Sequence, residues 1–216
     1  MKKILQKHQN HWSQRYLVIS SVVGVIFLTI SLFISYIATQ YATRIASNPV
    51  TDIVLSNVRV FDVDEIIIYG TIFFITLVLF ILALQPHRIP FGTKSVGLFF
   101  LIRAVFISIT HIGPFQSHVI LGSRSILDFI GIGNTSDLFF SAHTGLPFLL
   151  ALACWNNKYL RYLFLSSSLF GGTIVLLGHI HYSIDVLGAL FITYTIFEIT
   201  KYLFPRDYHG FIEQDI

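Results

Sequence analysis

The segment LVISSVVGVIFLTISLFISYIA, residues Leu17–Ala38, contains no charged side chain over 22 residues. About 20 consecutive apolar residues in a helix are enough to cross the hydrocarbon core of a bilayer. The whole chain has the same character, since hydrophobic residues make up 54% and charged residues 12% of its composition. A soluble domain has about 25% charged residues. The sequence therefore predicts an integral membrane protein.

Five further apolar runs follow along the chain, so we predict an all-α, polytopic fold with six transmembrane helices. With neither an internal repeat nor a low-complexity linker, residues 1–216 are expected to form a single membrane domain. Residues 1–16 are expected to be a cytosolic leader before a signal anchor, because the apolar core that follows is too long for a cleaved signal peptide. The predicted spans are Leu17–Ala38, Glu65–Leu84, Val96–Gly113, Leu138–Trp155, Leu160–Leu177 and Val186–Phe204.

The distribution of Lys and Arg predicts the orientation. With the N-terminus in the cytosol, ten of these residues lie in inner segments and three in outer ones, and Arg103 falls within a span. Such an excess is typical of cytoplasmic loops, so both termini are expected to be cytosolic. The inner residues are Lys2, Lys3, Lys7, Arg15, Arg88, Lys94, Lys158, Arg161, Lys201 and Arg206, and the outer ones are Arg44, Arg59 and Arg124.

Two histidine-containing segments lie at the edges of apolar runs. SDLFFSAHTG, Ser136–Gly145, contains His143, and HIHYSIDV, His179–Val186, contains His181 and Asp185. In the predicted topology these three residues lie at the outer ends of spans four, five and six, at one depth. Ionisable groups near the membrane interior are costly to desolvate and often functional.

The three side chains suit phosphoryl transfer through a phosphohistidine. A carboxylate at Asp185 would orient the imidazole of His181 and stabilise its charged form, which makes the other ring nitrogen a better nucleophile. His143, from another helix, would exchange a proton with the leaving or attacking alcohol. The alternative is that the histidines are interfacial residues without a catalytic role.

Arg103 and Asp137 are candidate substrate-binding residues. An arginine within a span is expensive and suits a phosphate ligand, although an ion pair with Asp62 or Asp137 would also explain it. Asp137 would bind a headgroup ammonium or act as a helix N-cap. His179 is expected at most to support the site, and Cys154 to be a packing residue.

Two other functions are compatible with the same sequence features. A membrane zinc amidase or hydrolase would use His143, His181 and Asp185 as metal ligands beside a bound water, although Arg103 would be an unhelpful neighbour for a cation. A transporter would need polar groups through the full depth of the bilayer, whereas here they gather near one face.

These segments resemble the sphingomyelin synthase family within the lipid phosphate phosphatase (PAP2) superfamily. The family motifs read approximately GDxxxSGHT and HYTxDV, where this chain has SDLFFSAHT and HYSIDV. Weaker similarities are RAVFISIT at Arg103–Thr110, Pro49-Val50-Thr51-Asp52 and PRDYH at Pro205–His209, so that the resemblance covers about residues 49–209.

The resemblance implies that His181 is the nucleophile, Asp185 its partner and His143 the acid–base group, with Asp137 at the headgroup. It implies a phospholipid donor and a diacylglycerol- or ceramide-type lipid alcohol, with no cofactor, metal or nucleic acid. Ala142 and Ser136 stand where the family has glycine, and the loop before Asp137 lacks the family's glutamate. The sequence does not identify the headgroup, the acceptor lipid or the oligomeric state, and it does not distinguish transfer from hydrolysis. The short loops favour a bacterial plasma membrane with the site facing outward.

Overall fold

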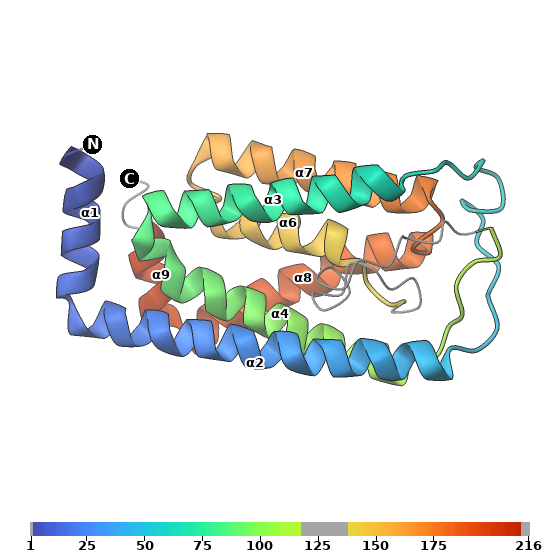
Figure 1. Cartoon of the computed structure of the whole chain (residues 1–216), viewed down its shortest axis with the longest axis horizontal. Coiled ribbons are helices and arrows are strands. Elements are labelled where there is room, and N and C mark those ends of the chain that lie inside the picture. Colours follow the sequence, from blue (N-terminus) through green and yellow to red (C-terminus); the bar gives the residue numbers. More distant parts are fainter. Residues whose placement is uncertain (1, 118–137, 213–216) are drawn as a thin grey trace.

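The computed structural model describes residues 2–117 and 138–212. All regular elements within these residues are helices, as predicted. The long helices run alternately along one axis, so both termini lie at one end of the bundle and the loop 46–63 at the other (Figure 1). The helices are α1 (Lys2–Ser13), α2 (Arg15–Ile45), α3 (Asp64–Leu84), the 3₁₀ turn η1 (Pro86–Arg88), α4 (Ile89–Ile109), α6 (Ala142–Ala153), α7 (Lys158–Leu177), α8 (Ser183–Leu203) and α9 (Pro205–Ile212).

Five helical segments of the described chain are long and apolar enough to cross a membrane. They are Arg15–Ile45, Asp64–Leu84, Pro86–Ile109, Lys158–Leu177 and Ser183–Leu203. The fourth predicted span, Leu138–Trp155, contains the shorter helix α6, which has only 12 residues. It packs against α7, α8 and α4. The membrane-spanning prediction is thus confirmed for five helices, and α6 is a short apolar helix within the bundle.

Helices α2 and α4 pack closely because α2 presents small side chains to its neighbour. A Cβ atom at Gly24 would lie 2.2 Å from Oγ1 of Thr93, and one at Gly97 of α4 would lie 2.7 Å from the ring of Phe27. Small residues allow helix backbones to approach closely in membranes. The buried residues of α2 are Ser20, Ser21, Gly24, Ser31, Ser35, Ala38, Thr39 and Ala42.

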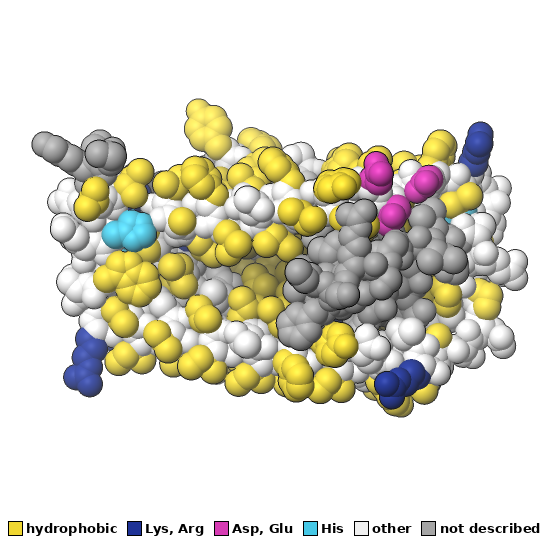
Figure 2. Space-filling view, in the orientation of Figure 1, with side chains coloured by type: hydrophobic (Ala, Val, Ile, Leu, Met, Phe, Trp, Pro, Cys, Tyr) yellow, Lys and Arg dark blue, Asp and Glu magenta, His cyan; other side chains and the backbone are white. Residues whose placement is uncertain are grey.

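The outer surface is mainly hydrophobic. Figure 2 shows apolar side chains over the middle of one face, with the visible charged side chains toward its two ends. Large apolar side chains such as Phe73, Phe191 and Leu169 are 69%, 76% and 75% exposed. Exposure on this scale over helices of spanning length fits contact with lipid chains.

Candidate active site

The start of α8 brings His181 and Asp185 together. His181 precedes the helix, Tyr182 is its N-cap, and Asp185 occupies the third helical position. The Asp185 carboxylate accepts a hydrogen bond from the Tyr182 backbone N–H at 3.0 Å, and the same oxygen lies 3.1 Å from Nδ1 of His181. The i,i+4 spacing would place both side chains on one face of a helix that began near His181, but α8 begins at Ser183. The contact arises because the carboxylate caps the helix and reaches back to the imidazole. Both side chains are buried.

Asp52, in the loop after α2, holds the same turn through its side chain. One of its oxygens accepts hydrogen bonds from the backbone N–H and the hydroxyl of Ser183, at 2.8 and 2.7 Å. The other accepts from the N–H groups of Val54 and Leu55. Burial alone would raise the pKa of Asp52, but the hydrogen bonds from Ser183, Leu55 and Val54 hold this pKa below its ordinary value. The carboxylate therefore stays ionised beside the N-terminus of α8, where negative charge is favourable.

The start of α6 places His143 beside this turn. The backbone N–H of Ser141, the N-cap of α6, donates to the Asp185 carbonyl at 3.1 Å. Phe139 and Phe140 approach it with positive φ values of 143° and 33°, a backbone conformation that costs about 1–3 kcal/mol and is often found at functional sites. Helix α7 then packs against the first turn of α6. A Cβ atom at Gly171 would lie only 2.3 Å from the His143 carbonyl oxygen.

Several buried polar atoms around these helix starts have no hydrogen-bond partner within the described chain. Both ring nitrogens of His143 belong to this group, as does the second carboxylate oxygen of Asp185. Three hydroxyl groups also belong to it, those of Ser141 and Thr144 at the start of α6 and that of Thr193 on α8. Unsatisfied buried donors and acceptors are costly and require an explanation. A bound polar ligand, such as a phosphoryl group, would satisfy the ones nearest to the two histidines.

Arg103 on α4 joins the site from a third direction. Its side chain is buried, and Nε donates to the Phe140 carbonyl at 3.2 Å. Phe140 is three residues before His143 in the chain, so this hydrogen bond brings Arg103 to the segment that carries His143. The structure therefore gathers four of the predicted site residues, Arg103, His143, His181 and Asp185, at one end of the bundle.

The other residues considered above do not join this group within the described chain. Asp137 falls outside the described residues. His179, in a turn with φ of 54°, contacts the Ser117 hydroxyl at 2.8 Å and the Val58 carbonyl at 3.1 Å, so it connects the loops after α4 and α2. Asp62, offered above as a partner for Arg103, has a carboxylate oxygen 3.3 Å from the N–H of Asp64. Cys154 is buried in the core, as predicted.

The geometry gives little support to a zinc site. Within residues 2–117 and 138–212, no three His, Cys, Asp or Glu side chains converge as a group that could hold a metal ion. The hydrolase alternative based on zinc is therefore not favoured by these residues.

Residues 135–203 match the family model described as PAP2 superfamily C-terminal. The matched segment contains His143, His181 and Asp185, whereas Arg103 lies before it. Among curated proteins, no match was found. The match supports a relationship with the PAP2 superfamily and indicates an enzyme of the lipid phosphate phosphatase or phosphotransferase type, which acts on lipid phosphoesters in a membrane.

Proposed function

We propose that this protein transfers a phospho-headgroup between membrane lipids through a phosphohistidine on His181, in the manner of the sphingomyelin synthase family. The contact between Nδ1 of His181 and the Asp185 carboxylate carries this proposal. It fixes the Nδ1–H tautomer, which leaves Nε2 with a free electron pair for attack on phosphorus. The carboxylate also stabilises the positive charge that the imidazole acquires.

In the first step, Nε2 of His181 forms a bond to phosphorus, and the bond from phosphorus to the glyceride oxygen breaks. The leaving alkoxide takes a proton from His143 and departs as a diacylglycerol-type alcohol. His143 suits this role because its ring nitrogens have no protein partner among the described residues. Arg103 would balance the negative charge on the phosphoryl oxygens in the transition state.

In the second step, an acceptor hydroxyl gives its proton to neutral His143 and attacks phosphorus. The bond between phosphorus and Nε2 breaks, and His181 is regenerated. A ceramide-type alcohol as acceptor makes the protein a transferase, and water as acceptor makes it a hydrolase. The resemblance of the two histidine motifs to the sphingomyelin synthase family supports the lipid alcohol as acceptor.

The positive-inside bias supports an orientation in which this site faces the outside of a bacterial plasma membrane. In that arrangement both substrates reach the histidines from the outer leaflet. Asp137, six residues before His143 in the chain, would contribute to the headgroup site.

The test is a reconstitution of the purified protein into vesicles that contain a phospholipid with a labelled headgroup and a ceramide-type acceptor. The expected product is an acceptor lipid with the labelled headgroup, detected by mass spectrometry. His181→Ala should form none, whereas His111→Ala should be fully active, because His111 contacts Ser108 and Tyr41 away from the site. A soluble labelled phospho-headgroup as the only product would make the protein a hydrolase. Equal activity of the two variants would contradict the assignment of the nucleophile.

A further inference from the structure

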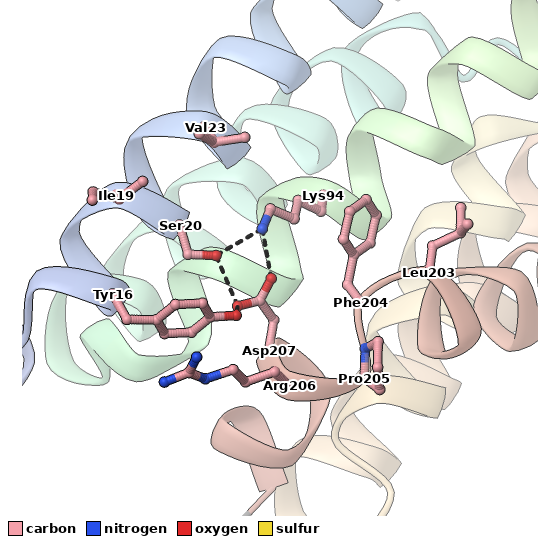
Figure 3. A pocket seen from close by; sticks show the side chains of 10 residues that line it. All are labelled: Tyr16, Ile19, Ser20, Val23, Lys94, Leu203, Phe204, Pro205, Arg206 and Asp207. Carbon is pink, nitrogen blue, oxygen red and sulfur yellow. Dashed lines mark hydrogen bonds and ion pairs between the residues drawn. The ribbon is translucent and has the colours of Figure 1, made fainter.

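A pocket of about 300 Å³ lies at the other end of the bundle, between the start of α2 and the junction of α8 and α9 (Figure 3). It combines polar side chains with apolar ones. The lining residues are Tyr16, Ile19, Ser20, Val23, Lys94, Leu203, Phe204, Pro205, Arg206 and Asp207. The proposed reaction uses none of these residues.

The inner wall of the pocket is a closed polar network around Asp207. One carboxylate oxygen accepts hydrogen bonds from the hydroxyl groups of Tyr16 and Ser20, both at 2.7 Å, and the other lies 2.5 Å from Nζ of Lys94. Lys94 also donates to the Ser20 hydroxyl and lies over the ring of Phe204. Burial opposes ionisation of Asp207, yet the hydrogen bonds from Lys94, Tyr16 and Ser20 hold its pKa below the ordinary value. The charges of Lys94 and Asp207 therefore cancel.

The positive charge of Arg206 remains at the pocket after those of Lys94 and Asp207 cancel. Its guanidinium lies 3.6 Å from the centre of the Tyr16 ring, and its side chain is exposed. No carboxylate of the described chain forms an ion pair with it. Stacking on an aromatic ring fixes the plane of a guanidinium and leaves its N–H groups available to an anion, for which the planar fork is well suited. The pocket therefore has at its edge one fixed cation that no carboxylate of residues 2–117 and 138–212 neutralises.

The apolar part of the pocket lining belongs to membrane-spanning helices. Ile19, Val23 and Leu203 are 51%, 49% and 51% exposed and belong to helices of membrane-spanning length. Arg206 follows the last residue of α8 by three positions, and Tyr16 is the second residue of α2. The pocket thus lies where two spans end, at the depth of lipid headgroups, with its apolar side toward the acyl chains.

We propose that this pocket binds a membrane phospholipid, with the phosphodiester at Arg206 and an acyl chain along Ile19, Val23 and Leu203. The single positive charge matches the single negative charge of a phosphodiester. A free phosphate ion offers the same charge chemistry but uses no apolar wall, so the two ligands are distinguishable. The site is at the opposite end of the bundle from His143 and His181 and does not depend on the function proposed for them.

The test uses the full-length protein with the additional substitution His181→Ala, so that no lipid is consumed. Phosphatidylglycerol is titrated into the delipidated protein in detergent, and bound lipid is counted by native mass spectrometry. Arg206→Gln should weaken the tightest binding about tenfold, the effect expected for loss of one charge-assisted hydrogen bond. The matched control is Arg15→Gln, which removes the same charge from an exposed neighbour of Tyr16 that does not line the pocket. It should bind like the parent protein.

Two outcomes would overturn the proposal. An equal loss of binding in Arg206→Gln and Arg15→Gln would mean that lipid associates through general surface charge. Displacement of the lipid by an excess of inorganic phosphate would mean that the pocket is a site for a free phosphate ion. Retention of lipid in excess phosphate, with the loss specific to Arg206→Gln, is the expected result.

Discussion

Asp52 and Ser183 are 131 residues apart in the sequence, and two hydrogen bonds of 2.8 and 2.7 Å join them at the end of the bundle opposite α1 and α9. Ser183 lies midway between His181 and Asp185. The loop after α2 therefore holds the turn that carries the proposed nucleophile and its carboxylate partner.

Replacement of Asp52 by Ala should lower both stability and activity. Loss of a side-chain cap costs about 0.5–2 kcal/mol, and the freed turn should misalign His181. We expect a lower midpoint of thermal unfolding and a lower kcat with little change in KM. Asp62→Ala, in the same loop, is the control for loss of one carboxylate. If the two variants had the same kcat, Asp52 would not position the site.

The depressed pKa of Asp52 predicts a dependence of stability on pH. A carboxylate whose pKa is lower in the folded than in the unfolded protein stabilises the fold above its ordinary value of 3.8, and loses this contribution as the pH falls through the folded value. The stability difference between the native protein and Asp52→Asn should therefore be largest near neutral pH and shrink below about pH 4. Thermal unfolding in detergent at several pH values measures it. A difference that grew toward low pH would contradict the capping role.

His143→Ala and His181→Ala should respond differently to the leaving group. A general acid–base group contributes about 10²–10⁴-fold, and an activated aryl phosphoester needs no proton on its leaving oxygen. Such a substrate should partly restore the rate of His143→Ala but not that of His181→Ala. Rapid quench with a labelled substrate should trap a phosphoenzyme in the first variant only. Equal restoration of both variants would show that the two roles are wrongly assigned.

Phosphohistidine chemistry and zinc hydrolysis predict opposite effects of chelation. We expect activity to survive EDTA and to be inhibited by orthovanadate, because vanadate adopts the five-coordinate geometry of the phosphoryl transition state. Asp185→Asn should keep the fold but reduce the rate steeply, since the imidazolium of His181 loses its carboxylate. About one zinc ion per chain, lost together with activity on chelation, would reject the phosphotransferase and favour the zinc enzyme.

The predicted topology places Asn57 outside and Lys158 inside the cell. Both residues are exposed, and Cys154 is buried. In a Cys154→Ala background, a cysteine at position 57 should react with an impermeant thiol reagent added to intact cells, and one at position 158 only after lysis. The reverse pattern would invert the orientation and move the histidine site to the cytosolic side.

Hydropathy predicted where the spans lie better than where the helices begin and end. Helix α4 begins at Ile89 rather than near Val96, because its first turns contain polar residues such as Thr93 and Lys94 that face the protein interior. Helix α6 is shorter than its apolar run, since the positive φ values of Phe139 and Phe140 delay its start. The amphipathic helices α1 and α9 have no uniformly apolar run and were not predicted.

The site could be predicted as a set of residue types but not as a set of contacts. The spacing of His181 and Asp185 indicated their pairing, which local capping geometry produces. The hydrogen bonds from Ser183 to Asp52 and from Arg103 to Phe140 join segments distant in sequence, and no local pattern predicts such contacts. The Pro-Val-Thr-Asp similarity was the one signal that pointed to Asp52.

The hydrogen bond between the Ser141 N–H and the Asp185 carbonyl uses backbone atoms alone. No side-chain replacement at either position removes the donor or the acceptor, proline at 141 excepted. This link between the two histidine segments therefore does not depend on the side chains at positions 141 and 185. If His181 and His143 have the roles proposed above, substitutions near Ala142 could alter the proposed headgroup site while this backbone link between the two segments is kept.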